Sequence, residues 1–231
     1  MNNIFKLCQV DRHKFCSHII NSSSPKPDFY FLIILSTLIV ALGLLANNII
    51  LVIGGMLVTP LLSPLLAIAL GLVIGDLKVT LRSVKIFLNS LVFVIFVAFV
   101  VGSLGSANIA EIDLIAMMTP SLLAFFIAVV AGLAASYAWA KPGLNETLPG
   151  VSIAVTLIPP LTAIGLAAAG QNWIILITLL KVLLLNIFGI ILASFVVFTL
   201  MDFYKARKKV IKEVKAEEKE LKKNNNYTFV N

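Results

Sequence analysis

Two segments of the chain combine prolines with hydroxyl side chains inside long apolar runs. Their residues are Thr59, Pro60, Ser63 and Pro64 in the first segment and Thr156, Pro159, Pro160 and Thr162 in the second. A proline removes a backbone N–H and clashes with the preceding turn, so each segment is expected to break a helix. At a break, freed amides favour an anion and freed carbonyls favour a cation. The expected chemistry is non-covalent binding of a small solute or ion, unless the hydroxyls only cap the freed backbone groups.

Three further polar residues, Asn89, Lys181 and Asn186, interrupt apolar runs. A lysine within a membrane span costs about 2.5–3.5 kcal/mol unless it meets water or a partner, and no acidic residue lies inside any expected span. Lys181 therefore either extends to the outer surface or lines a cavity as a fixed positive charge, which would favour an anionic substrate. The two asparagines either bond across helices or line the same pathway.

The elements that carry these residues are long stretches without a charged side chain. Residues 29–75 contain none, and this run is more than twice the roughly 20 apolar residues that cross a bilayer. Further charge-free runs cover residues 86–110, 114–140, 147–180 and 182–201. The chain is 60% hydrophobic and only 13% charged. Because backbone groups in lipid must be satisfied within their own segment, these runs predict the helices of an integral membrane protein.

The pattern predicts an all-α protein with six transmembrane helices. The expected spans cover residues 29–46, 49–75, 83–104, 120–140, 148–170 and 174–201. The second and the fifth are expected to be broken at their prolines. Asn47-Asn48 is expected to form a tight turn between the first two spans, because asparagine tolerates left-handed geometry. Pro120 suits the first turn of the fourth helix.

The placement of lysine and arginine predicts the orientation of the spans. Positive residues precede the first span, separate the second from the third and follow the last, whereas the loop between the third and fourth has none. Six crossings then place both termini and the loop from Lys78 to Lys85 in the cytoplasm of a cell-membrane protein. The alternative topology has two re-entrant hairpins and four crossings, and it places that loop outside. We interpret the net charge of +7 as a determinant of topology rather than of nucleic-acid binding.

The two halves of the membrane part resemble each other. The expected divisions are a cytoplasmic segment 1–28, a first membrane repeat 29–104, an extracytoplasmic loop 105–119, a second membrane repeat 120–201 and a cytoplasmic charged tail 202–231. Residues 57–61, LVTPL, align with residues 157–161, LIPPL. Three crossings in each half would invert the second copy, as in secondary transporters whose broken helices meet near the midplane. Similarity of composition between apolar helices is the alternative explanation.

The residue types argue against an enzyme and against a bound cofactor or metal. No span holds paired carboxylates, a catalytic histidine or an HExxH zinc motif, and the chain has no P-loop. The histidines and cysteines of the N-terminal segment, His13, His18, Cys8 and Cys16, fit no zinc spacing, and a reducing cytoplasm predicts no disulfide. The lack of an embedded acidic or histidine relay favours a facilitator, a channel or a sodium-coupled carrier over a proton pump.

Several motifs resemble one known family. Residues 54–64, GGMLVTPLLSP, and 71–76, GLVIGD, are similar to the first signature of the bacterial and archaeal membrane family catalogued as domain of unknown function 389. Residues 150–161, GVSIAVTLIPPL, followed by Gly165-Leu166, resemble its second signature, and residues 186–189, NIFG, resemble the start of its last span. The resemblance covers about residues 29–201. It implies a multi-spanning membrane protein, with transport as a suggested role.

The expected function is therefore a membrane transporter or channel for a small solute or ion, with its site where the two broken helices meet. The expected partners are the lipid bilayer, the solute and further copies of the chain, because faces rich in Gly, Ala and Ser permit close packing. No nucleic acid is expected. The alternative is a membrane scaffold or sensor in which small residues such as Ala131, Gly132, Ala134 and Ala135 only pack helices.

Overall fold

The described part of the chain consists of helices and the segments that connect them. The computed structural model describes residues 15, 18, 19, 23, 25–104, 118–141, 147–206 and 211 and, for residues 147–155, the backbone alone. Its elements are α2 (Pro27–Leu45), α3 (Ile49–Val58), α4 (Leu62–Ile74), α5 (Leu77–Leu104), α7 (Leu122–Ala140), α8 (Thr147–Ala169), α9 (Trp173–Leu200) and the 3-10 helix η2 (Phe203–Ala206). The expected all-α class is confirmed for these residues. Most of the predicted loop 105–119, the N-terminal segment and the charged tail lie outside them.

The turn between α2 and α3 follows the expectation for paired asparagines. Asn47 adopts the left-handed conformation, with φ of 49°. The Asn48 side chain then accepts hydrogen bonds from the backbone N–H groups of Ile50 and Leu51, at 3.0 and 3.3 Å. This satisfies two of the amides that the first turn of a helix leaves without partners. The first two apolar helices are thereby joined by a very short connection.

The predicted break in the second span is confirmed at Pro60. α3 ends at Val58, α4 begins at Leu62, and the two helices are bent by 55°. Thr59 has ψ of 127°, the extended conformation that a proline imposes on the residue before it. Pro64 belongs to the first turn of α4, where a missing N–H costs no intrahelical bond. Pro60 alone therefore lies at the break.

The predicted break in the fifth span is wrong. α8 runs without interruption from Thr147 to Ala169, with Pro159 and Pro160 inside it. The φ angle of proline is compatible with a helix. What opposes a continuous helix is the carbonyl one turn earlier, which loses its N–H donor. The surroundings of α8 supply another donor, as described below. Side chains around the prolines are also buried, Leu157, Ile158 and Leu161 among them, so packing holds this segment in the helix.

Two predicted helix starts are also corrected. α5 begins at Leu77 rather than at residue 83, because Asp76 accepts hydrogen bonds from the N–H groups of Lys78 and Val79, at 2.9 and 3.1 Å. Lys78 and Lys85 therefore lie on the helix and not in a loop. α7 begins at Leu122 after Ser121, whose hydroxyl accepts from the Ala124 N–H at 3.1 Å. The preceding proline lies outside the helix.

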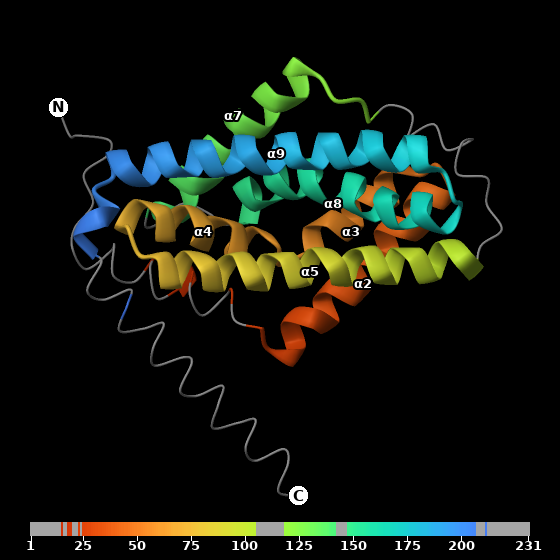
Figure 1. The fold of residues 1–231 in the computed structure, drawn as a ribbon, viewed down its shortest axis with the longest axis horizontal. Helices are drawn as coiled ribbons and strands as arrows, with labels where there is room; N and C mark the ends of the chain where they lie inside the picture. Colours follow the sequence, from red (N-terminus) through yellow and green to blue (C-terminus); the bar gives the residue numbers. More distant parts are fainter. Residues whose placement is uncertain are drawn as a thin grey trace, which may run out of the picture.

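The helices form a bundle with a central group between two long flanking helices. α3, α4 and α8 lie between α5 and α9 (Figure 1). α5 packs against α4 and α8, and α9 packs against α8 and α4. α2 lies against α3 and α5 at one edge of the bundle, and α7 lies against α9 and α8 at the opposite edge (Figure 1). The segments on either side of Pro60 and the segment around Pro160 thus both belong to the centre.

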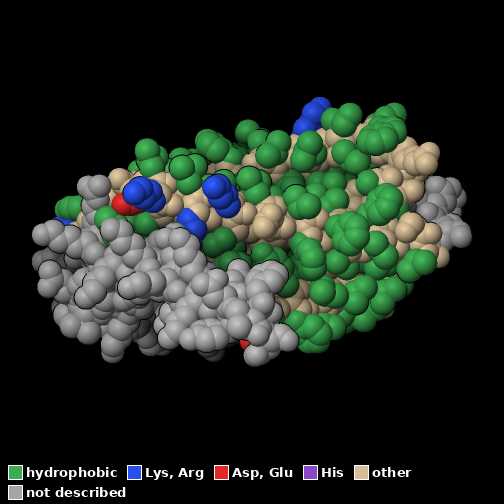
Figure 2. Space-filling model, turned by 60° about the horizontal axis from the view of Figure 1, so that its bottom comes forward, with side chains coloured by type: hydrophobic (Ala, Val, Ile, Leu, Met, Phe, Trp, Pro, Cys, Tyr) green, Lys and Arg blue, Asp and Glu red, His purple; other side chains and the backbone are tan. Residues whose placement is uncertain are grey.

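The outer surface is apolar. α2, α5, α7 and α9 are each long and apolar enough to cross a membrane, and the bent pair α3 and α4 counts as a fifth span. Exposed large side chains occur along all of them, as at Leu104 and Ile174, which are both 82% exposed. On the face shown in Figure 2, hydrophobic side chains cover most of the described surface, while several Lys and Arg side chains gather toward one end. Such a surface is that of a membrane protein.

Part of the N-terminal segment packs on the bundle, which the sequence did not predict. The Phe15 ring lies 5.4 Å from the Phe198 ring and 4.9 Å from the Phe203 ring, measured between centroids. Ile19 is fully buried in the same core. Phe15 therefore packs on the end of α9 and the start of η2. Such a contact between segments distant in sequence leaves no periodic signal in a short, mostly polar stretch.

Candidate solute-binding site

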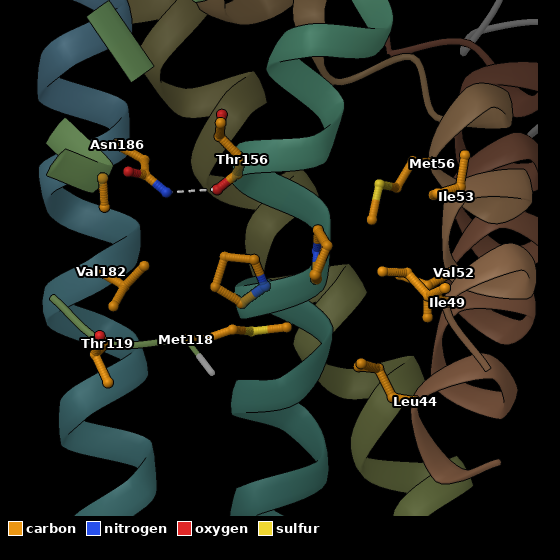
Figure 3. A pocket seen from close by; sticks show the side chains of 13 residues that line it. Leu44, Ile49, Val52, Ile53, Met56, Met118, Thr119, Thr156, Val182 and Asn186 are labelled. Carbon is orange, nitrogen blue, oxygen red and sulfur yellow. Dashed lines mark hydrogen bonds between the residues drawn. The ribbon is translucent and has the colours of Figure 1, made fainter. Parts of the chain in front are cut away.

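A pocket of about 580 Å³ lies beside the prolines of α8. Its wall comes mainly from α3, α8 and α9, with one residue of α2 and three residues from the start of α7 and the segment just before it (Figure 3). The lining residues are Leu44, Ile49, Val52, Ile53, Met56, Met118, Thr119, Ala124, Thr156, Pro159, Pro160, Val182 and Asn186. A volume of this size suits a small organic solute, and a mostly apolar wall with few polar groups is typical of ligand pockets.

The polar end of the pocket is built around Thr156 and Asn186. In a regular helix the Thr156 carbonyl would accept from residue 160, but Pro160 has no N–H. The Asn186 amide of α9 instead donates to this carbonyl, with a Nδ2–O distance of 2.6 Å (Figure 3). A side chain of one helix thus replaces the missing backbone donor of another. The bond supplies the donor that Pro160 lacks and joins α9 to α8 beside the pocket.

Three buried polar atoms of α8 and α9 have no partner among the described residues. They are the Asn186 Oδ1, the Thr162 Oγ1 and the Ser194 Oγ. Asn186 is 5% exposed and Thr162 is fully buried. Buried polar atoms without a partner are uncommon and often mark a place where water or a ligand binds. Asn186 therefore offers an acceptor in addition to the donor that it uses for α8.

The first proline segment has a polar contact of a different kind. The Thr59 N–H bonds to the Met56 carbonyl, at 3.4 Å, and so leaves the Gly55 carbonyl without its usual donor. Ser36 of α2 donates its hydroxyl to that carbonyl at 2.8 Å. The same Ser36 hydroxyl also contacts the Thr59 hydroxyl. Here too another helix satisfies the carbonyl that the break frees.

The structure brings together only part of the predicted site. Thr156, Pro159, Pro160 and Asn186 line the pocket, whereas Thr59, Pro60, Ser63, Pro64, Asn89, Thr162 and Lys181 do not. Ser63 and Pro64 are buried in α4, and Thr59 and Pro60 lie half-buried at the break. Asn89 and Lys181 point outward from α5 and α9, where they are exposed. The fixed positive charge considered for Lys181 is therefore absent from the pocket wall.

Sequence reasoning missed Met56 and Met118 in the pocket wall and Ser36 in the contact at the α3–α4 break. Met56 and Met118 both extend into the pocket (Figure 3), and methionine in an apolar run carries no signal of such a role. Ser36 was also missed. Ser36 and Thr37 are the only Ser or Thr residues in the first apolar run, residues 29–46. Their rarity in that run could have marked them as candidates for a polar contact. A hydroxyl within a span must find a partner, either in its own helix or in another.

The polar groups of the pocket wall are neutral hydroxyl and amide side chains. None of the lining residues is charged. Within the described ranges, no three His, Cys, Asp or Glu side chains come together as a metal site would require. The pKa of Lys205 is raised, mainly by its hydrogen bond to Asp202, but this pair lies beyond α9 and is exposed. Recognition in the pocket would therefore rely on shape, apolar contact and a few hydrogen bonds.

The fold and its surface define a helical membrane protein, and sequence comparison gives its family. The model of the domain of unknown function 389 family matches residues 56–192, more than half of the chain, so the chain belongs to that family. The chain is 27% identical over 194 residues to an uncharacterized protein of Methanocaldococcus jannaschii. The match covers 84% of this chain and 59% of that relative, so the chain spans less than two thirds of the relative's length. No solved structure matches the chain.

Proposed function

We propose that the protein is a membrane transporter or channel for a small solute or ion, and that the pocket beside Pro159 and Pro160 belongs to the solute pathway. The observation that carries the proposal is the pocket itself. It joins a mostly apolar wall to the polar contact between Asn186 and Thr156 in the middle of the bundle. Asn186 lies thirteen residues after Trp173, about 20 Å along a helix of about 42 Å, which is close to mid-membrane depth.

The arrangement of the two halves supports the same proposal. The third helix of each half packs against the second helix of the other half, α5 against α8 and α9 against α4. Two inverted repeats would pack in this way, with the third helix of each repeat against the second helix of the other. Met56, one turn before Pro60, also lines the pocket that contains Pro160. We therefore propose inverted three-helix repeats whose proline segments converge, with one broken and one continuous.

Six crossings with both termini in the cytoplasm remain our proposed topology, with α8 as the crossing added to the five spans above. Lys78, Arg82 and Lys85 lie on the first turns of α5, so that end of the helix would face the cytoplasm. The test is a Lys78→Cys variant in which Cys8 and Cys16 are replaced by Ser. In intact cells an impermeant thiol reagent should leave position 78 unlabelled, and labelling from outside would instead favour the re-entrant topology.

A homo-oligomer in the membrane is the proposed assembly. Asn89 is exposed midway along α5, among the exposed apolar side chains of Leu88 and Val92. Its amide both donates and accepts, so the same residue of a second copy satisfies it in a symmetric contact. Native mass spectrometry in mild detergent should show an oligomer that Asn89→Leu weakens. A wild-type protein found only as a monomer would contradict the proposal.

Transport itself is tested with protein reconstituted into liposomes. Osmotic shrinkage and recovery are followed with glycerol as a neutral probe and with potassium chloride as an ionic one. At least one probe should enter faster than in protein-free liposomes. Replacing Pro60 and Pro160 together by alanine should abolish that entry while leaving insertion intact, and Pro120→Ala, outside the helices, is the matched control. Equal entry with and without protein, or unchanged entry in the double variant, would favour a non-transporting scaffold or sensor.

A further inference from the structure

We propose that the pocket beside Pro159 and Pro160 binds a neutral small organic molecule and excludes ions of either sign. This inference rests on the proposed function for transport, and it deepens that function by naming the class of solute. Binding itself does not depend on transport and can be measured in purified protein. The class of ligand follows from what the pocket wall offers and from what it lacks.

The pocket wall carries no charge that could balance an ion. The thirteen described residues that line it are all neutral. Lys181 directly precedes Val182, a lining residue, yet its own side chain is exposed and lies outside the wall. Moving an ion from water into an apolar site is very costly unless opposite charges or several hydrogen bonds replace its water shell. An ion in this pocket would therefore depend on the backbone for its ligands.

The backbone of α8 gives an ion little to bind at the pocket. An anion would need free N–H groups, but α8 is continuous here, and Pro159 and Pro160 have no N–H. A cation would need a freed carbonyl, and the one that Pro160 frees, at Thr156, already accepts from the Asn186 amide at 2.6 Å. The continuous helix thus withholds the ion ligands that a broken helix would provide.

The wall suits a molecule that is mostly apolar and carries one or two polar groups. Val52 and Met56 of α3 lie opposite Val182 of α9 across the pocket (Figure 3). Three lining side chains are polar, each with a hydroxyl or an amide: Thr119, Thr156 and Asn186. Such groups both donate and accept hydrogen bonds, so they match a neutral hydroxyl or amide on a ligand. The volume of about 580 Å³ lies within the usual range for small-molecule pockets.

α3 offers a reporter position for binding and a matched control. Ile53 lines the pocket and is 43% exposed, whereas Ile50 is 77% exposed and is not part of the wall. The two residues are less than one turn apart on the same helix, so a cysteine at either position meets a similar detergent environment. A ligand in the pocket would shield only position 53. Effects of a probe on the detergent itself would change labelling at both positions.

The experiment follows the rate at which N-ethylmaleimide labels Ile53→Cys in the purified full chain, with Cys8 and Cys16 replaced by Ser. The probes are benzyl alcohol, benzoate and benzylammonium, and butanol, butyrate and butylammonium, so that size is matched while charge differs. At least one neutral probe, at three times its Kd, should slow the labelling about four-fold by mass action. The charged probes at the same concentration should leave the rate unchanged. Labelling of Ile50→Cys should respond to none of them.

A second pair of variants tests whether the shielding ligand lies in the pocket. Val182 is buried in the wall, whereas Leu184 on the same helix is exposed and is not part of it. Val182→Trp places an indole in the pocket and should remove the protection of Ile53→Cys. Leu184→Trp should keep the protection. If Val182→Trp fails to fold, Val52→Trp on the opposite wall replaces it.

The outcomes separate this inference from the transport function. Equal protection by neutral and charged probes would overturn the neutral class, and so would no protection by any neutral probe or protection that persists with the indole in place. Protection without entry of glycerol or potassium chloride into the liposomes would support the neutral site and contradict transport. Entry of potassium chloride but not glycerol, abolished by the double proline variant, would support transport and overturn the neutral class.

Discussion

At Pro60 the chain leaves the helix and resumes it at an angle, whereas at Pro159 and Pro160 the helix continues. Each site frees a carbonyl, and each carbonyl is satisfied by a side chain from another helix. The difference lies in the donor: a short serine hydroxyl at the first site and a longer amide at the second. A proline in a membrane helix therefore does not by itself decide whether the helix breaks.

The largest expected effect concerns the close approach of α2 and α3 at the first site. Gly55→Ala should destabilise the protein by about 1–3 kcal/mol, because the new Cβ would meet the Val40 backbone. Gly54→Ala is the control, since a Cβ there meets nothing within 4 Å and alanine favours the helix. Equilibrium unfolding in mixed micelles gives both values. Equal effects of the two substitutions would refute the close packing on which the first site depends.

The next largest effect concerns the donor at the second site. Asn186→Leu should cost about 1–2 kcal/mol, because the Thr156 carbonyl would lose the hydrogen bond from the Asn186 amide. Thr178→Ala on the same helix should cost under about 0.5 kcal/mol, since its hydroxyl only bonds back to the Ile174 carbonyl. The same unfolding measurement applies. A cost for Asn186→Leu no larger than that of the control would mean that packing alone keeps α8 continuous.

A double-mutant cycle sharpens the comparison further. Pro160→Ala restores the backbone N–H that the Thr156 carbonyl lacks, so the Asn186 amide becomes dispensable. Asn186→Leu should therefore cost about 1 kcal/mol less in the Pro160→Ala background than in the wild type. Additive costs of the two substitutions would show that the amide and the missing N–H do not serve the same carbonyl.

The smallest effect distinguishes two threonines that the sequence alone makes equivalent. Thr59→Val removes a hydroxyl that contacts Ser36 and should cost about 0.5–1 kcal/mol. Thr162→Val removes a buried hydroxyl that has no partner among the described residues and should cost nothing or stabilise slightly. The unfolding midpoints of the two variants give the comparison. A larger loss for Thr162→Val would indicate that this hydroxyl holds a bound water.

The sequence predicted the apolar helices, the turn at Asn47-Asn48 and the break at Pro60, because each depends on local chemistry. It failed at Pro159 and Pro160, where the donor for the Thr156 carbonyl comes from Asn186, far along the chain. It also misplaced the start of α5, since the Asp76 cap competes with a charge pattern that is typical of a loop. Local sequence rules identify where a helix loses a backbone hydrogen bond. Tertiary contacts determine whether that hydrogen bond is replaced.

The sequence predicted the kind of site, a polar contact at prolines within apolar helices, but only some of the residues that line it. Prolines and Asn186 were named for the right reason, because a freed carbonyl needs a polar partner in a membrane. Lys181 and Asn89 were placed with them, since a charge-free run hides which face of a helix points inward. The exposed positions of both residues follow from how α5 and α9 rotate against the bundle. Because these helices are apolar on nearly every side, their sequences have no periodic pattern that would indicate the rotation.

The bond between Asn186 and Thr156 also constrains how the protein is made. α8 leaves the ribosome before α9, and until α9 arrives the Thr156 carbonyl of α8 has neither its backbone donor nor the Asn186 amide. In hydrocarbon such a group is costly, so an α8 that entered the bilayer alone would be incomplete. α8 and α9 therefore enter the membrane most favourably as a pair. A nascent chain that stops short of Asn186 should hold α8 less firmly in the bilayer than a chain that includes it.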